Sequence, residues 1–395
     1  MLSANLKKES ARTLKYRHPW IFSGAIKSIK GTPKSGESLE VSSEEGEILG
    51  YGSYSPKSKI AIRMWSFSEK EKLDEELIRK RITDAVSFRL KSDLFKKSDC
   101  CRLIFAEADG IPGLIVDKFA DYLVCQFLFA GVEFWKAAIV AILNDIVPNK
   151  GIYERSDVEI REKEGLPLLT GVLSGSEPPD LLEINEGTIK YHIDIKNGHK
   201  TGFYLDQGIN RLRVALHAKD AEVLDCFTYT GGFSIAAIKG GASKVTSVDS
   251  SAPAIEALRK NVELNGLDVA KCELVEAKVA EQLRKYRDQA RQFDLIILDP
   301  PKFIYDRAHL EQATRAYKDI NLLAIKLLRK NGILASFSCS QPMTEELFQK
   351  MVSYAAVDAN KSVQILEKLN QSPDHPIALN FPESAYLKGL ICRVF

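Results

Sequence analysis

From Ile189 onward, the sequence alternates between short apolar stretches and longer segments whose apolar residues recur at helical spacing. We expect strands at 222–226, 244–248, 272–275, 293–298 and 332–338. We expect helices at 233–239, 252–265, 279–289, 310–329 and 344–357. Strands and helices that alternate in this way are joined by right-handed crossovers into a doubly wound parallel sheet. The pattern therefore predicts a Rossmann-like α/β domain, with its ligand beyond the carboxyl ends of the strands.

The first 185 residues have a different pattern. Up to about residue 70, short strand-like segments at 20–22, 38–41, 48–52 and 60–65 are separated by glycines and a proline, which is typical of a small β-barrel. The following region begins with a long amphipathic segment, expected to be a helix from Asp74 to about Lys97. Its apolar residues fall on one helical face: Leu77, Ile78, Ile82, Ala85, Val86 and Leu90. Further short strands follow, so the region is predicted to be an α+β domain. We therefore place three domains at 1–70, 71–185 and 186–395, which a chain of 395 residues can accommodate.

The loop after the first strand of the α/β domain indicates a cofactor site. The strand ends at Asp225 and leads through Gly231-Gly232 into a helix, and the next strand ends at Asp249, followed by Ser250. Glycines permit a tight turn close to a ligand, and an acid at the second strand end can accept hydrogen bonds from ribose hydroxyls. Because the GxGxxG pattern of pyrophosphate binders is missing, S-adenosylmethionine fits better than NAD. The alternative is a glycine pair that only packs a helix.

The segment Asp299-Pro300-Pro301-Lys302-Phe303 directly follows the fourth strand. Two prolines after an acid fix the backbone and direct the carboxylate into the cleft. Methyltransferases that act on planar nitrogenous rings commonly carry this element, and an aromatic ring such as Phe303 can stack on a base. The segment therefore predicts a site for a nucleobase.

Cys339 follows the fifth strand, between two serines, and is expected beside Asp299 in the parallel sheet. Carbon 5 of cytosine is too weak a nucleophile to take a methyl group directly from a sulfonium. A thiolate that adds at carbon 6 converts the ring to an enamine, and an acid at N3 neutralises the developing charge. We expect Cys339 to be this nucleophile and Asp299 the N3 partner. Cys125, Cys272 and Cys392, in strand-like segments, are expected to be buried.

Charge and composition constrain partners and location. The net charge is only +2, but the first 35 residues contain a single acid among eight basic residues, which favours phosphate locally. These basic residues are Lys7, Lys8, Arg12, Lys15, Arg17, Lys27, Lys30 and Lys34. The cysteines and histidines lack metal-ligand spacing, so no metal is expected. An N-terminus without an apolar stretch and the absence of any run long enough for a bilayer predict a cytoplasmic protein with no membrane segment.

Taken together, the motifs resemble a family of bacterial 23S (large-subunit) ribosomal RNA cytosine-5 methyltransferases, over essentially the whole chain. The motifs are Arg17–Gly24, Asp109–Gly113, His199–Gln207, Phe227–Phe233, Asp299–Phe303, Phe337–Ser340 and Tyr386–Gly389. The resemblance implies an N-terminal PUA domain that binds RNA, a class I methyltransferase domain, S-adenosylmethionine as cofactor, Cys339 as nucleophile and a homodimer. Many RNA cytosine-5 methyltransferases carry a second cysteine after the fourth-strand prolines, where this chain has Lys302-Phe303.

These motifs and the strand ends at Asp225 and Asp249 define the expected site residues. For the cofactor they are Lys200, Thr201, Gly202, Phe203, Gln207, Asp225, Phe227, Thr230, Gly231, Gly232, Asp249 and Ser250. For the base they are Pro300, Pro301, Lys302 and Phe303. The loop at 197–207 is expected to fold over the cofactor, although Lys200 and Asp206 can also be solvated turn residues. Two other functions stay open: methylation of an exocyclic amine on an RNA base, which needs no cysteine, and a non-catalytic RNA-binding or ribosome-assembly factor.

Overall fold

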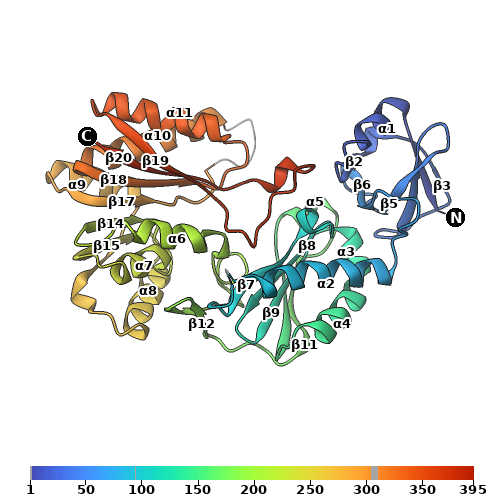
Figure 1. Ribbon diagram of the computed structural model, residues 1–395, viewed down its shortest axis with the longest axis horizontal. Helices are drawn as coiled ribbons and strands as arrows, with labels where there is room; N and C mark the ends of the chain where they lie inside the picture. The colour runs from blue at the N-terminus through green and yellow to red at the C-terminus, as the bar shows by residue number, and fades with distance from the viewer. Residues whose placement is uncertain (1, 94, 304–309) are drawn as a thin grey trace. The chain divides into compact units, whose positions relative to one another are not determined.

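The computed structural model describes residues 2–93, 95–303 and 310–395, which form two compact units (Figure 1). The first unit contains Met1–Thr188, Ile193–Leu205 and Pro373–Ser384. The second contains Ile189–His192, Asp206–Ser372 and Ala385–Phe395. The first unit therefore combines the N-terminal half of the chain with a segment from near the C-terminus.

The N-terminal part of the first unit is a six-stranded sheet in the order β2-β6-β5-β4-β1-β3. Its strands are β1 (Ser3–Leu6), β2 (Trp20–Phe22), β3 (Ile26–Lys30), β4 (Ser38–Ser42), β5 (Ile48–Tyr54) and β6 (Ile60–Ser66), with helix α1 (Lys8–Leu14) after β1. Alternate residues of β1 and β4 face a shared core, as the period of two in a strand requires. The strands predicted from the sequence are present, and β1, β3 and α1 are additions to them.

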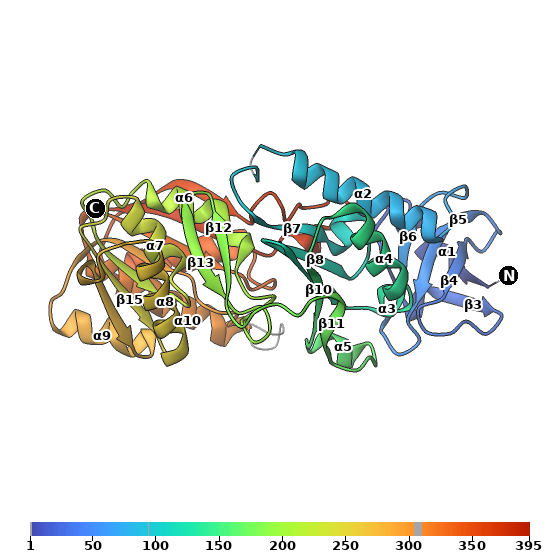
Figure 2. The same ribbon diagram turned by 90° about the horizontal axis from the view of Figure 1, so that it is seen from below.

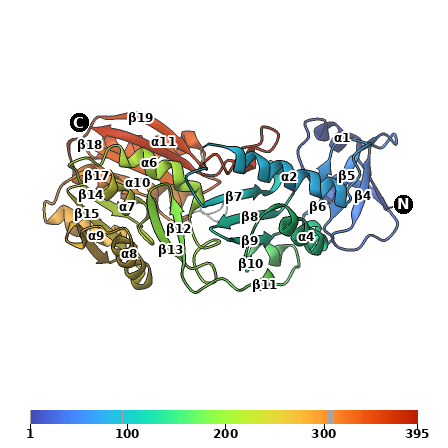
Figure 3. The same cartoon turned by 60° about the horizontal axis from the view of Figure 1, so that its bottom comes forward.

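A five-stranded sheet in the order β11-β10-β9-β8-β7 follows, with α2 packed against β7 and α4 (Figure 3). The elements are α2 (Glu75–Lys91), β7 (Cys100–Phe105), β8 (Leu114–Phe119), β9 (Tyr122–Phe127), α3 (Ala130–Phe134), α4 (Lys136–Ile146), β10 (Gly151–Ser156), α5 (Ile160–Lys163) and β11 (Leu169–Gly175). The Asp74 side chain caps α2 by accepting a hydrogen bond from the Leu77 amide. The prediction that this helix continues to about Lys97 was wrong, because the backbone becomes extended at Ser92. Leu90, expected on the buried face, is 45% exposed.

A buried ion pair joins strand β6 to the end of helix α5 in the first unit. Arg63 of β6 donates to both carboxylate oxygens of Glu164, at 2.8 and 3.0 Å, and both side chains are almost fully buried. The guanidinium also lies 3.5 Å from the centre of the Phe129 ring. Residues 1–70 therefore share a buried contact with the region that follows them.

The second unit is built on a seven-stranded sheet in the order β16-β15-β14-β17-β18-β20-β19. Its strands are β14 (Glu222–Cys226), β15 (Lys244–Asp249), β16 (Cys272–Glu276), β17 (Phe293–Leu298), β18 (Leu328–Ser338), β19 (Val363–Asn370) and β20 (Lys388–Val394). Neighbours from β16 to β18 are parallel, whereas β20 is antiparallel to both β18 and β19. Outside this sheet, the described residues also form the strands β12 (Leu182–Glu186) and β13 (Ile189–Ile193).

Helices cover both faces of this sheet (Figures 1 and 2). They are α6 (Gly208–Ala215), α7 (Gly232–Lys239), α8 (Ala252–Leu264), α9 (Val279–Asp288), α10 (Leu310–Leu327) and α11 (Glu345–Asp358). One buried cluster joins α9, α10 and α11 to the sheet, and another joins α6 and α7 to the opposite face. The predicted fold class is confirmed: a Rossmann-like α/β domain with a β-rich N-terminal region and a central α+β region. Among the described residues, no helix is both long and apolar enough to cross a bilayer.

The Arg63–Glu164 pair generates a stability prediction. Replacing Glu164 by Gln leaves the buried Arg63 guanidinium without its countercharge, so the free energy of unfolding should fall by roughly 3–5 kcal/mol. Urea unfolding measures this change. Asp121→Asn is the matched control, because its ion pair with Lys150 is solvent-exposed and its loss should change little. Equal effects of the two substitutions would contradict the role given to the buried pair.

Candidate active site

Four strand ends of the second unit bring the sequence-predicted residues to one edge of the sheet. β14 pairs with β15 and β17, and β17 pairs with β18, all in parallel. Cys226 is thus in register with Leu298, which is in register with Ser336. The polar residues that end or follow these strands therefore emerge at the same edge, where α/β proteins bind ligands.

Asp225 is the most buried carboxylate at this edge, with 1% of its surface exposed. One oxygen, Oδ2, accepts hydrogen bonds from Thr228 Oγ1 at 2.7 Å and Ser234 Oγ at 2.6 Å. The other oxygen, Oδ1, is buried and has no hydrogen-bond partner among the described residues. Burial raises the pKa of Asp225 to about 6. An acceptor in this state is costly unless a ligand or water donates to it.

The loop after β14 has a strained backbone. Phe227 and Tyr229 adopt left-handed conformations, with φ of 63° and 49°, and Gly231 follows at 90°. Such conformations cost on the order of 1 kcal/mol or more for residues other than glycine and gather at functional sites. Asp249 holds the loop in place, because its Oδ2 accepts from the Tyr229 amide at 2.9 Å and its Oδ1 from the Ser251 amide at 3.0 Å.

Gly231 and Gly232 allow the turn after β14, and they also let neighbouring helices pack closely against it. A Cβ on Gly231 would lie 2.0 Å from Leu258 Cδ1 of α8, and one on Gly232 would lie 3.1 Å from Arg211 Cδ of α6. The close approach that these glycines permit is therefore to neighbouring helices. Thr230 is buried beside them, whereas Ser250 is exposed. The helix-packing interpretation of the pair holds in part.

The predicted cofactor residues of the 197–207 loop fall into different units. Lys200 to Phe203 belong to the first unit, where Thr201 Oγ1 donates to the buried carboxylate of Asp117 at 2.6 Å. Lys200 is exposed, with its ammonium 4.4 Å from the centre of the Tyr204 ring. Gln207 belongs to the second unit and accepts from Asn210 Nδ2 at 2.6 Å. The contacts of these residues with a cofactor stay a prediction.

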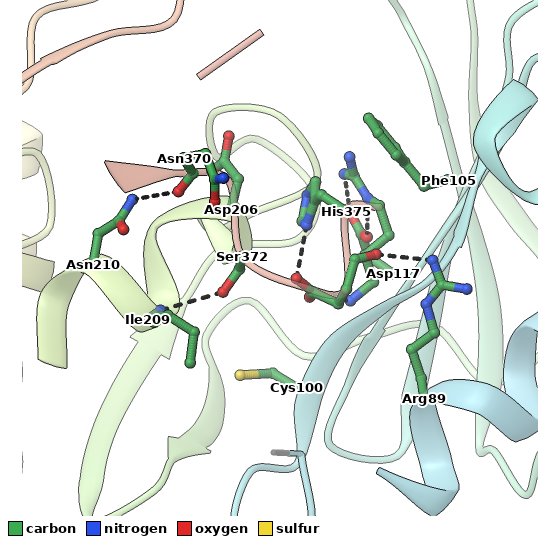
Figure 4. A network of polar contacts seen from close by, with 12 residues as sticks. Arg89, Cys100, Phe105, Asp117, Asp206, Ile209, Asn210, Asn370, Ser372 and His375 are labelled. Carbon is green, nitrogen blue, oxygen red and sulfur yellow. Dashed lines mark hydrogen bonds and ion pairs between the residues drawn. The ribbon is translucent and has the colours of Figure 1, made fainter. Parts of the chain in front are cut away.

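Asp206 connects three segments of the second unit that sequence reasoning did not combine. Its carbonyl accepts from the Ser372 amide at 2.8 Å, and its Oδ2 accepts from the Tyr386 hydroxyl at 2.6 Å. Beside it, Asn210 donates to the Asn370 carbonyl at 3.0 Å (Figure 4). Asp206 is buried, so the interpretation of it as a solvated turn residue was wrong.

Cys339 lies next to the Asp299-Pro-Pro segment, as the strand order predicted. Its Sγ is 4.0 Å from the carbonyl oxygen of Pro300. Tyr317 of α10 holds both flanking serines: its hydroxyl accepts from Ser338 Oγ at 2.9 Å and lies 3.2 Å from Ser340 Oγ. Burial raises the pKa of Tyr317 to about 12, so the hydroxyl stays protonated. Tyr317 had no sequence signal, since it is one of several apolar-face residues of a helix.

Phe303 packs within the protein. Its ring centre lies 4.9 Å from that of Tyr317 and 6.3 Å from that of Phe227. Of the other residues expected to contact the base, Pro300 is buried, whereas Pro301 and Lys302 are exposed. Stacking of Phe303 on a base stays a prediction.

Most of the remaining cysteines are buried, which makes their thiols unreactive. Cys125 and Cys392 are buried as expected, and burial raises the pKa of Cys392 to about 12. The prediction that Cys272 is buried was wrong, because it opens the edge strand β16 and is partly exposed. Burial still raises its pKa to about 11.

Comparisons with known proteins agree with this architecture. A model of the S-adenosylmethionine-dependent methyltransferase family matches residues 169–393, and one of a PUA-like domain matches residues 4–67. A Streptococcus mutans protein described as a candidate methyltransferase has a TM-score of 0.84 at 24% identity, over 100% of both chains. Another such structure, solved with S-adenosylhomocysteine, has a TM-score of 0.86 at 23% identity, also over 100% of both chains. The chain therefore has the fold of the S-adenosylmethionine-dependent methyltransferase family and belongs to that family.

Curated relatives narrow the family further. Proteins named ribosomal RNA large subunit methyltransferase I from Klebsiella pneumoniae (strain 342) and Enterobacter sp. (strain 638) are 46% and 47% identical to this chain. The alignments cover 98% of this chain and 97% and 98% of those proteins. The chain belongs to the ribosomal RNA large subunit methyltransferase I family.

The described residues fit the cofactor of this family, S-adenosylmethionine. Its ammonium group is a donor suited to the unpartnered Oδ1 of Asp225, and a carboxylate accepts strongly from such a group. Asp249 ends the neighbouring strand, where an acid can accept from ribose hydroxyls. Asp225 and Asp249 are therefore the side chains that we expect to hold the cofactor in the second unit.

Asp225 is expected to lower the free energy of unfolding and to strengthen the binding of S-adenosylmethionine. Because its pKa is raised from 3.8 to about 6, its ionised form disfavours folding, and that stability is lost as pH rises from about 4 to about 6. Asp225→Asn removes the charge, so near pH 7 the cofactor-free variant should gain up to about 3 kcal/mol in free energy of unfolding. Calorimetry should show at least tenfold weaker S-adenosylmethionine binding.

The control for Asp225 is Asp249→Asn. Asp249 is only partly buried, so its substitution should weaken cofactor binding without a comparable gain in stability. Urea unfolding at pH 4 and pH 7 separates the two carboxylates. If Asp225→Asn is less stable than the unsubstituted chain at pH 7, the prediction is wrong. The hydrogen bonds to the Asp225 carboxylate would then outweigh the cost of burying its charge.

Proposed function

We propose that this protein methylates carbon 5 of a cytosine in large-subunit ribosomal RNA through a covalent adduct with Cys339. The observation that carries the proposal is the juxtaposition of Cys339 Sγ with the Pro300 carbonyl, 4.0 Å away, directly after Asp299. A thiol and a carboxylate at the same edge are the two groups that activation of a cytosine ring requires. The names of the curated relatives support ribosomal RNA of the large subunit as the substrate.

Each group then has a defined task. Bound S-adenosylmethionine supplies an electrophilic methyl group. Cys339 adds as a thiolate to carbon 6 of the base, and Asp299 holds a proton at N3 while negative charge develops there. Tyr317 fixes both neighbours of Cys339, so the sulfur approaches the ring from one direction. Once carbon 5 of the adduct carries the methyl group, the N3 proton returns to Asp299. The carbon-5 proton then passes to water, the carbon-5 to carbon-6 double bond re-forms, and the bond to Cys339 breaks to release the thiolate.

A pocket of the first unit supports RNA as the substrate class. It has a volume of about 600 Å³ and lies where the PUA-like region meets the α+β region. Its lining includes Lys15, Tyr16, Arg17, Phe67 and Arg81, together with the acids Glu107 and Asp109. Tyr16 is 81% exposed, so its ring is available to a base, and the cations suit phosphates. The side chain of Arg12, from the same basic cluster, is outside the described part of the chain.

The expected homodimer and the expected cytoplasmic location stay predictions. Methylation of an exocyclic amine is the alternative, and substitution of Cys339 distinguishes it from methylation at carbon 5.

Substitution of the proposed nucleophile tests the covalent mechanism. Cys339→Ala should lower methylation of large-subunit ribosomal RNA at least a thousandfold, because carbon 5 is not nucleophilic without the adduct. Calorimetry should show unchanged S-adenosylmethionine binding, and Cys272→Ala is the control for loss of a partly exposed cysteine. Mass-spectrometric mapping of the RNA identifies the methylated atom. Full activity of Cys339→Ala, with the methyl on an amine, refutes the proposal.

Removal of positive charge tests whether the pocket binds RNA. The test uses the whole chain, because a truncation at residue 70 would break the buried Arg63–Glu164 pair. Lys15→Gln combined with Arg17→Gln should weaken RNA binding. The slope of log Kd against log salt concentration should fall by about 1 for each phosphate contact that is lost. Lys30→Gln with Lys34→Gln is the control, since these exposed lysines do not line the pocket. Equal losses from the two double variants would mean that the pocket has no special role.

A further inference from the structure

Lys388 links the segment that carries Cys339 to the start of β20. It is the first residue of β20 and lies opposite Ser338 in the antiparallel pairing of β18 with β20. Its ammonium donates to the Ser340 carbonyl and to the Tyr386 carbonyl, both at 2.8 Å. Cys339 lies between Ser338 and Ser340. Lys388 therefore contacts both of its neighbours: it donates to the carbonyl of Ser340 and is the strand partner of Ser338.

Lys388 itself is held in place by a buried anchor. The residue two positions before it, Tyr386, donates its hydroxyl to Asp206 at 2.6 Å and its amide to Gln371 Oε1 at 3.2 Å. Asp206 and Tyr386 come from the motifs His199–Gln207 and Tyr386–Gly389, which are far apart in the sequence. Their contact explains why both motifs belong to the same site, since together they fix the backbone from which Lys388 projects.

The electrostatics of the site connect Lys388 with the thiol. Desolvation lowers the pKa of Lys388 to about 8, and the negative charge of Cys339 opposes this shift. The interaction is reciprocal, because a nearby cation favours a thiolate by as much as the thiolate favours the cation. From the other packed elements, Tyr317 of α10 faces the site as a neutral phenol, and the charges of Cys339 and Asp299 both act on it. A carboxylate at Asp299 opposes a thiolate at Cys339. Lys302, further along that segment, is exposed.

We propose that Lys388 is the positioning residue of the nucleophile: it fixes the Cys339 segment through the Ser340 carbonyl, and its positive charge stabilises the Cys339 thiolate. In this step the S–H bond breaks, the proton passes to water and the electron pair remains on sulfur. The inference rests on the proposed covalent function, which makes the thiolate the reactive form.

The test measures how alkylation of Cys339 by iodoacetamide depends on pH, by mass spectrometry of the Cys339 peptide. In the original chain its midpoint should lie below about 8.5, the value of an ordinary thiol. Lys388→Met should raise the midpoint by about one pH unit and slow alkylation at pH 7 about tenfold. Lys388→Arg keeps the charge and should restore most of the rate. The Cys272 peptide in the same digest is an internal reference and should not change.

Lys368→Met is the matched control, because Lys368 is an exposed lysine of β19 that pairs with Glu345. It should leave the Cys339 profile unchanged. The inference is overturned if Lys388→Met alkylates like the original chain, or if the original chain has a midpoint above that of an ordinary thiol. The alkylation assay needs no RNA and no cofactor, so its outcome is separate from that of the proposed function. Full methylation by Cys339→Ala would refute the covalent function even if the Lys388 effect were found.

Discussion

The parallel pairing of β14, β17 and β18 determines where every proposed reactive group lies. The register aligns Cys226, Leu298 and Ser336 across three neighbouring strands. A slip of one residue would turn the alternate side chains of β18 to the opposite face and separate Cys339 from Asp299. The register is secured because the strands are buried by helices on both faces, so each side chain has one compatible face.

Several groups at this edge are kept in states that a stable core would avoid. Asp225 is a buried carboxylate with one unpartnered oxygen, Phe227 and Tyr229 have left-handed backbones, and Lys388 is a partly desolvated cation. Each of these features disfavours folding by itself. Each also prepares a group for a ligand or a reaction, which is why such features concentrate at functional sites. The surrounding apolar clusters compensate for them and hold them in one arrangement.

Much of this arrangement was predictable from the sequence. The apolar runs at 222–226 and 293–298 form strands with those bounds, because central parallel strands are hydrophobic on both faces. β3 was missed, since Ile26 and Ile29 are three residues apart and give no alternation. β19 was missed because most of its residues are exposed or only partly buried at the sheet edge. The pairing of β20 against the parallel strands depends on tertiary contacts that no local pattern encodes.

The site could be predicted where a motif combined several unusual residues in a row, as in Asp299-Pro-Pro-Lys-Phe303. It could not be predicted where a single residue of a common type reaches the site only through tertiary contacts. Tyr317 is an apolar-face residue of α10, and Lys388 is an unremarkable lysine until β18 and β20 pair. The Asp206–Tyr386 contact joins positions 180 residues apart.

The central claim is that Cys339 forms a bond with carbon 6 of the target cytosine. It is tested most directly with a large-subunit ribosomal RNA substrate that contains 5-fluorocytosine, incubated with the protein and S-adenosylmethionine. The carbon-5 fluorine cannot leave as the proton does, so methyl transfer should leave the RNA bound to the protein through denaturing electrophoresis. Peptide mass spectrometry should place the bond on Cys339. Turnover of RNA with no protein-bound product would contradict the covalent mechanism.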